Sequence, residues 1–267
     1  MNVYIVFCDF SSSSQVLNRR SAESTCDYLE GTFLVSLIIE WIIEMSDVLN
    51  SISALPSQGS ATVMGNNLLS FFSGLTPEDK RFVKDSMRWA EYRADLRHNR
   101  NSEPAAWFEY YSGVLWSVGW SLEQAPVIHV DKNFTGNALD VWARSLSQQL
   151  SREKVGLMKE AFHMLETHSD AIDVFRGSAR EWSDFRFSPA QYNFNRELEI
   201  VVSNVRLLDA KWSSTYLFWT IQHTGSELDI RSRRFLIRSA AINENRLQLA
   251  AAVLDMRTRE IELARGA

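Results

Sequence analysis

Two histidine–aspartate pairs are the residues of this chain whose types and spacing favour acid–base chemistry. His129 and Asp131 flank Val130, so an extended backbone would place both side chains on one face. His168 lies near Asp170 at a predicted helix junction, where a carboxylate would orient the imidazole as a general base. No nucleophile can be assigned beside either pair. A polar strand edge and a helix cap explain the same residues without catalysis.

The chain contains none of the motifs that usually accompany nucleotide, hydrolase or zinc chemistry. GxGxxG and Walker loops, a GxSxG elbow and an HExxH helix are all absent from the sequence. His163 and His168 lie five residues apart, and on a continuous helix about 140° separates them, which disfavours a shared metal ion. We expect no metal site and no cofactor.

The densest charge feature is the segment RSRRFLIR, which contains Arg231, Arg233, Arg234 and Arg238. On a strand, Arg231 and Arg233 would share a face and form a basic surface for a phosphate, a lipid headgroup or an acidic partner. Pairing with carboxylates on neighbouring strands explains the arginines without any ligand, and the candidates are Glu197, Glu199 and Asp229.

The composition predicts a folded protein rather than a disordered or fibrous one. Of 267 residues, 45% are hydrophobic and 23% are charged, which suits a packed core in one large or two modest domains. The formal net charge of -5 disfavours broad attraction to a phosphate backbone, so we expect no nucleic-acid partner. Cys8 and Cys26 are too few for a disulfide framework, and we expect reduced thiols.

The beginning of the sequence is interpreted as an N-terminal arm, residues 1–32, which would pair as a strand with the C-terminal sheet or hang free. It lacks the basic segment, long apolar stretch and cleavage site of a secretory signal. We therefore expect cytoplasmic synthesis without Sec export, with release by another route left open. Residues 33–45 are apolar but shorter than the ~20 residues that span a bilayer, and they favour an amphipathic or buried helix.

Helical patterns dominate residues 33–176 and predict a helical bundle. After a loop expected at 49–67, apolar spacing and capping signals predict helices over 76–98, 102–126, 139–150 and 152–168. Six of the nine tryptophans fall in this bundle, namely Trp41, Trp89, Trp107, Trp116, Trp120 and Trp142. Core packing explains them, and a ligand pocket or a membrane-interface belt is the functional alternative.

From residue 184 the apolar period becomes two, which predicts strands. The pattern covers 198–202, 216–223 and 228–237, with turns expected at 209–214 and 224–227. These strands would form an antiparallel meander. Residues 243–258 fit either a helix capped by Asn243 or a further strand.

Together these patterns predict an α+β protein, with an N-terminal helical bundle followed by a C-terminal antiparallel β-sheet region over 184–267 that ends in a helix or strand. The missing motifs favour a non-enzymatic interaction or effector protein, of a toxin-like or virulence-associated kind, acting at a membrane or partner surface. Two alternatives stay open: an enzyme with a hydrophobic pocket and a His/Asp pair, and a structural subunit of an assembly. The oligomeric state is not predicted.

Overall fold

A computed structural model describes residues 59–146, 151–208, 220–256 and 260–263. In chain order its elements are β1 (Ser60–Met64), β2 (Asn67–Phe71), α2 (Pro77–Asp95), α3 (Pro104–Ser117), β3 (Ser121–Leu122), β4 (Val127–Asn137), α4 (Ala138–Ser145), α5 (Arg152–Thr167), α6 (Ser169–Trp182), β5 (Asp184–Tyr192), β6 (Leu198–Leu208), β7 (Thr220–Ile237), α7 (Ser239–Ala252) and β8 (Glu260–Leu263).

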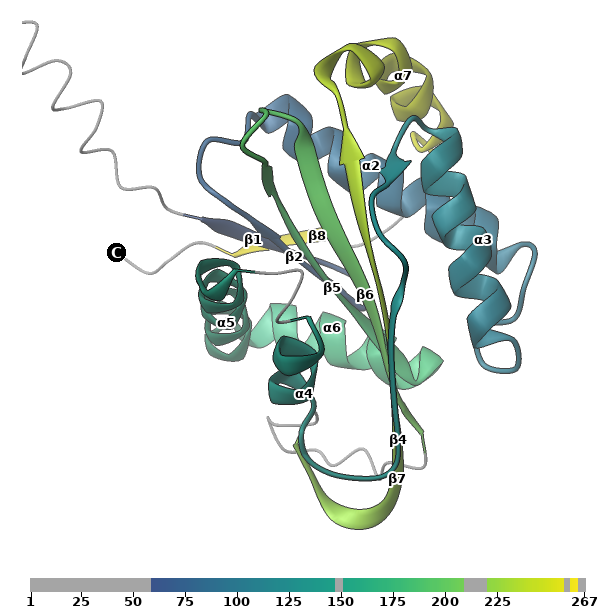
Figure 1. Ribbon diagram of the computed structural model, residues 1–267, viewed down its shortest axis with the longest axis vertical. Coiled ribbons are helices and arrows are strands. Elements are labelled where there is room, and N and C mark those ends of the chain that lie inside the picture. The colour runs from purple at the N-terminus through teal and green to yellow at the C-terminus, as the bar shows by residue number, and fades with distance from the viewer. Residues whose placement is uncertain (1–58, 147–150, 209–219, 257–259, 264–267) are drawn as a thin grey trace, which may run out of the picture. The chain divides into compact units, whose positions relative to one another are not determined.

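The described strands form one mixed sheet with helices on both faces (Figure 1). Its order is β3-β7-β6-β5-β2-β1-β8, and β4 also pairs with β7. Helices α4, α5 and α6 cover one face, and α2, α3 and α7 cover the other. The alternation along β5 serves both layers, because Phe185 and Phe187 enter the first core while Ala190 enters the second. Burial on both faces explains why β5 and β6 are buried almost throughout.

The predicted fold class is wrong in two respects. Strands β1 and β2 come before the first described helix, and the helices cover a sheet instead of forming a bundle. The sheet is mixed, since β2 runs parallel to β5 while the other paired strands are antiparallel. The predicted loop over 49–67 misses β1, because Gly65 and Asn66 form the turn of a short hairpin rather than part of a long loop.

Within the C-terminal region, β5, β6 and β7 pair antiparallel in chain order, but the predicted meander of strands 198–202, 216–223 and 228–237 is wrong, because the described part of the last two is one strand, β7. The turn expected at 224–227 is wrong, because β7 continues through it while pairing with β6 from Glu227 and with β4 at Ser226. Residues 239–252 form a helix, which decides between the two alternatives, but its N-cap is Arg238 rather than Asn243. The arm at 1–32, the helix at 33–45 and the turn at 209–214 lie outside the described residues.

Local helix signals are confirmed most clearly at α2. The Thr76 side chain accepts a hydrogen bond from the backbone N–H of Asp79 at 3.1 Å, and Pro77 occupies the first turn. One face of α2 is apolar and packs on the sheet through Phe82, Val83, Met87, Ala90 and Ala94. No helix in the described part of the chain is both long and apolar enough to cross a membrane.

Candidate functional site

The structure places His129 and Asp131 on one face of β4, opposite Ile230 and Leu228 of β7. The Oδ1 atom of Asp131 accepts a hydrogen bond from the backbone N–H of Asn133 at 3.1 Å. Five of the best-formed cavities in the described residues have neither His129 nor Asp131 in their walls. His129 and Asp131 share one face of the strand, as their spacing predicts. None of those cavities provides a place for a substrate beside them.

His168 forms the N-cap of α6, where its Nδ1 atom accepts a hydrogen bond from the backbone N–H of Ala171 at 3.4 Å. Asp170 lies exposed in the first turn of the same helix, where a negative charge complements the helix dipole. This geometry matches the capping alternative. His168 and Asp170 also lie outside the walls of those five cavities.

Replacing His168 with alanine is expected to lower the free energy of unfolding by about 0.5–1 kcal/mol, because one N–H at the start of α6 loses its acceptor. His168→Asn should keep the stability of the original chain, since asparagine is a preferred N-cap. Urea unfolding followed by tryptophan fluorescence measures both changes. Equal losses in the two variants would contradict a capping role.

The four arginines of the β7 segment each pair with a carboxylate. Arg231 contacts Asp229 at 3.1 Å, Arg234 contacts Glu199 at 2.9 Å, and Arg238 contacts Glu197 at 3.1 Å. Arg233 binds both carboxylate oxygens of Glu109 on α3. Because Glu199 also pairs with Lys154 of α5, Arg234 lies on the opposite face of the sheet from Arg233. The four side chains therefore do not form one basic patch, and ligand binding by them stays a prediction.

A concave region lies on the outer side of α2, α3 and α7. Three cavities of about 640, 240 and 650 Å³ adjoin there, and Trp89 lines all three. The first two also share Arg93 and Ser117, and the last two share Ala252. We call these cavities together the Trp89 groove.

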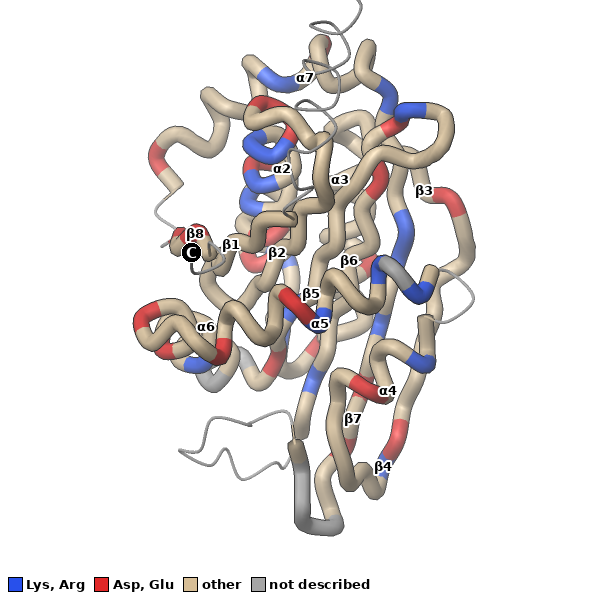
Figure 2. The backbone as a smooth tube through the Cα atoms, turned by 90° about the vertical axis from the view of Figure 1, so that its left-hand side faces the viewer, with Lys and Arg blue, Asp and Glu red and all other residues tan. Residues whose placement is uncertain are grey.

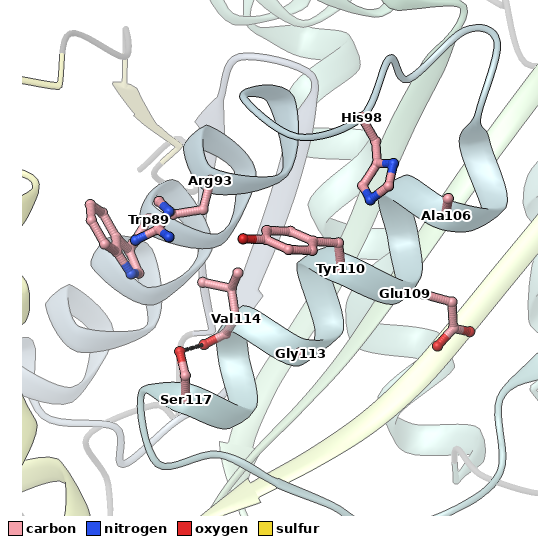
Figure 3. Close-up of a pocket in the computed structure, with 9 residues that line it drawn as sticks. All are labelled: Trp89, Arg93, His98, Ala106, Glu109, Tyr110, Gly113, Val114 and Ser117. Atoms are coloured by element: carbon pink, nitrogen blue, oxygen red, sulfur yellow. Dashed lines mark hydrogen bonds between the residues drawn. The ribbon is translucent and has the colours of Figure 1, made fainter.

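Figure 3 shows the α2–α3 part of the Trp89 groove. Trp89 and Arg93 come from α2, and Tyr110 projects from α3 toward them. The Arg93 guanidinium carbon lies 5.1 Å from the centre of the Trp89 ring, and the Tyr110 ring meets His98 edge-on at 5.6 Å. Glu109 points away from Tyr110 toward β7, consistent with its ion pair to Arg233. The groove thus presents aromatic and arginine surface at its centre.

Exposed apolar side chains lie on the same helical layer. Trp116 is 67% exposed, Leu247 is 78% exposed, and Leu254, just after α7, is 82% exposed. The other predicted bundle tryptophans divide between roles: Trp107, Trp120 and Trp142 are buried, Trp89 lines the groove, and Trp41 lies outside the described residues. Core packing accounts for the three buried tryptophans, and Trp89 packs against the core beneath α2, α3 and α7 while it lines the groove, whereas Trp116 belongs to neither core.

A buried ionic cluster fixes α2 and the α2–α3 connection to the sheet beneath the groove. Arg186 of β5 is fully buried, and its Nη2 atom contacts Glu91 at 2.7 Å and the Asn66 side-chain oxygen at 2.6 Å. Arg100 binds Glu91 and Asp95. The Asn66 amide also donates to Asp184 at 2.5 Å. We call these six residues the Arg186 cluster, and Figure 2 shows charged positions along the central strands as well as on the helices.

Aromatic rings close the Arg186 cluster from the α3 side. The guanidinium carbon of Arg100 lies 4.7 Å from the Trp107 ring centre, and that of Arg186 lies 5.4 Å from the same ring and 5.9 Å from Tyr111. Such stacking is favourable because the ring face carries negative charge density. Trp107 also donates its indole N–H to Asp95 at 2.8 Å. Arg186 and Asp184 are therefore held in a buried layer between α3 and the sheet, while Glu91 and Asp95 reach the edge of the third cavity.

The environment of the Arg186 cluster shifts the pKa values of its carboxyl groups in opposite directions. Burial raises the pKa of Glu91, but the adjacent Arg186 and Arg100 outweigh it and lower the pKa to about 2. Burial raises the pKa of Asp184, and the surrounding arginines only partly offset that effect. Burial likewise raises the pKa of Tyr111. Glu91 is thus the carboxylate that the cluster stabilises as an anion.

Sequence analysis did not identify the Arg186 cluster, although one signal was present. In DFRF, Asp184 and Arg186 alternate with Phe185 and Phe187, so the two charges share one face of a strand whose other face is aromatic. Glu91 and Arg100 lie in a distant part of the chain, and no local pattern links them to that strand.

Comparison with solved structures finds two weak likenesses. A structure titled "DELTA-ENDOTOXIN" aligns with a TM-score of 0.34 and 10% identity over 65% of this chain and 83% of that chain. A structure titled "Structure of the Evf virulence factor" aligns with a TM-score of 0.32 and 9% identity over 68% and 76%. Because both TM-scores lie below 0.5, neither structure identifies the function of this chain. No family model and no curated protein matches the sequence.

Proposed function

We propose that this chain is a non-enzymatic interaction or effector protein that binds a partner protein through the Trp89 groove. The observation that carries the proposal is the convergence of three cavities on one half-buried tryptophan. A toxin-like or virulence-associated role belongs to the same proposal. The two structures named above bear titles of that class, but their TM-scores give the proposal no weight.

The residue types of the groove favour a protein partner. Tryptophan, tyrosine and arginine supply most of the binding energy at protein interfaces, and Trp89, Arg93 and Tyr110 meet in this groove. Burying an aromatic ring there gains apolar contact without ordering a flexible side chain.

The charges around the groove favour a protein over a membrane surface. Arg93 and His98 face the first cavity together with Glu109, and Arg88 faces the third with Glu91, Asp95 and Asp255. Anionic lipid headgroups would require a clear excess of lysine and arginine. A mixed rim of this kind instead suits the polar border of a protein interface.

The exposed apolar residues also favour the α2–α3–α7 layer as the binding surface. Of the nine large apolar side chains exposed in the described residues, five lie on the α2–α3–α7 layer or directly after its helices: Tyr92, Leu96, Trp116, Leu247 and Leu254. Single exposed apolar residues are ordinary, but a gathering beside a groove is typical of an interaction site.

The enzyme alternative has one observation in its favour. His98 lines the groove, and its Nδ1 atom lies 3.7 Å from Glu103, which would serve as an acid–base pair. The one serine in this cavity wall, Ser117, donates its hydroxyl to the backbone oxygen of Val114 at 2.7 Å instead of to His98, so binding remains the better-supported function.

A photo-crosslinking residue tests where a partner binds. Gly113 lines the groove on α3 and Gly156 lies on α5 in the opposite layer, and at both positions an added side chain meets nothing within 4 Å. We expect a discrete protein adduct in cell extract from position 113 and none from position 156. Equal labelling at both positions would contradict a binding site in the groove.

Once the protein crosslinked at position 113 is purified, Trp89→Ala is expected to weaken the binding of this chain to it about 30-fold, which corresponds to about 2 kcal/mol. Lys159→Ala on α5 is the control and should leave the affinity unchanged. Flotation with phosphatidylcholine vesicles, with and without phosphatidylserine, tests the membrane alternative. Vesicle binding that is lost in Trp116→Ser would favour a lipid surface and contradict the protein partner.

A further inference from the structure

The outer edge of β4 is open in the described part of the chain. β4 pairs with β7 on one side, from Val127 opposite Ser232 to Asp131 opposite Leu228, and no described strand pairs with its other side. Figure 1 shows β4 running along the margin of the sheet. An open edge offers unpaired backbone N–H and C=O groups to another strand.

The regular part of β4 exposes the apolar side chains of Ile128 and Val130, which Lys132 follows. Ile128 is 54% exposed and Val130 is 45% exposed, and both lie on the side of the sheet that Asp229 and Arg231 occupy on β7. β-Branched side chains pack well across paired strands. Proteins usually protect such an edge with charged residues or bulges. In β4 the regular pairing continues through Asp131, and bulges begin only after it.

We propose that β4 pairs antiparallel with β4 of a second copy of this chain, centred on Val130. A two-fold axis perpendicular to the sheet places one residue opposite itself, and this centre puts Val130 against Val130. His129 of each copy then lies opposite Asp131 of the other, and Ile128 lies opposite Lys132, whose aliphatic stem covers it. The polar side chains on the edge thus complement a second copy.

Charge complementarity selects this register over its neighbour. A centre at His129 would also pair Ile128 with Val130, but it would set the two histidines against each other and leave Asp131 opposite Val127. Only the centre at Val130 satisfies both polar residues of that face. The result is one continuous sheet that passes through two copies.

The experiment uses the full chain with Cys8 and Cys26 replaced by serine, and a single new cysteine at Val130 or Ile128. Val130→Cys should form a disulfide-linked dimer under mild oxidation, because directly opposite Cα atoms of paired strands lie about 4.5–5.5 Å apart. Ile128→Cys faces Lys132 in this register and should stay largely monomeric. Equal crosslinking of the two variants would overturn the proposal.

Light scattering then tests the charge pairing without crosslinks. The unmodified chain should reach a dimer mass at or below about 100 µM, as expected for a modest interface. Asp131→Lys should raise the protein concentration at which half of the chain is dimeric by at least about tenfold. The double change His129→Asp with Asp131→His should restore the original concentration. A monomer throughout that range, or a double variant no better than Asp131→Lys, would overturn the proposal.

Discussion

Replacing Arg186 with methionine is expected to lower the free energy of unfolding by about 3 kcal/mol or more. The guanidinium is fully buried and contacts Glu91 and Asn66, so its loss leaves Glu91 with Arg100 as its remaining close cation and removes the donor to the Asn66 oxygen. Removing one partner of a buried ion pair costs more than the pair itself contributes, because the other charge stays desolvated. Urea unfolding at neutral pH measures the change.

A double variant separates the ionic contribution from packing. Arg186→Met together with Glu91→Gln removes both charges, so it should be clearly more stable than the sum of the two single changes predicts. Arg176→Met is the matched control, because Arg176 pairs with Asp173 on the exposed side of α6 and should cost less than about 1 kcal/mol. A loss below about 1 kcal/mol for Arg186→Met as well would show that the cluster does not stabilise the fold.

Acidification is expected to destabilise the protein through Glu91 by on the order of 3 kcal/mol between pH 5 and pH 2. Its pKa falls from 4.5 to about 2 in the folded chain, and each unit corresponds to about 1.4 kcal/mol. Because the folded pKa is the lower one, this stabilisation is fully present above pH 4.5 and is lost as the pH falls toward 2. Urea unfolding at intervals across that pH range measures how the free energy of unfolding changes with pH.

Two variants show which carboxyl group causes the free energy of unfolding to fall at acidic pH. Glu91→Gln should be less stable at neutral pH but should lose less stability on acidification. Asp184→Asn should steepen the acid loss instead, since Asp184 has a raised pKa and its protonation favours the folded chain. The asparagine oxygen can still accept from Asn66, which limits structural damage. An unchanged slope in Glu91→Gln would show that other carboxyl groups cause the acid sensitivity.

Sequence patterns predict α2 and α5 closely because their signals are local, but they extend α3 to residue 126, although it ends at Ser117, and they predict no helix over 169–182, where α6 lies. Thr76 and Pro77 lie next to the helix that they start, and the apolar spacing of α2 is contained within α2 itself. The same patterns give the wrong fold class, because an apolar helix face does not reveal whether it packs on a helix or on a sheet. Helices of a three-layer fold and of a bundle look alike at this level.

Strand β4 shows why the sheet was only partly predictable. The short apolar run at 127–130 and the Asn and Gly residues at 133–136 indicate a strand that ends at a turn, yet β4 continues to Asn137 through bulges. None of the predicted site residues lines the Trp89 groove, and only the tryptophan-rich pocket alternative matched its residue types. Trp89 carried an aromatic signal, whereas its place on an outer groove depends on α7, whose packing against α2 no local pattern encodes.

The parallel contact between β2 and β5 has a consequence for how the chain folds. Asn67 lies directly beside Arg186 in that contact, although more than one hundred residues separate them in sequence. The segment between them supplies α2 through α6, five of the six described helices that cover the sheet. During synthesis β2 therefore lacks its parallel neighbour β5 until more than one hundred further residues have emerged. The pairing of β2 with β5 is expected to limit the folding rate. The Arg186 cluster forms only at that step.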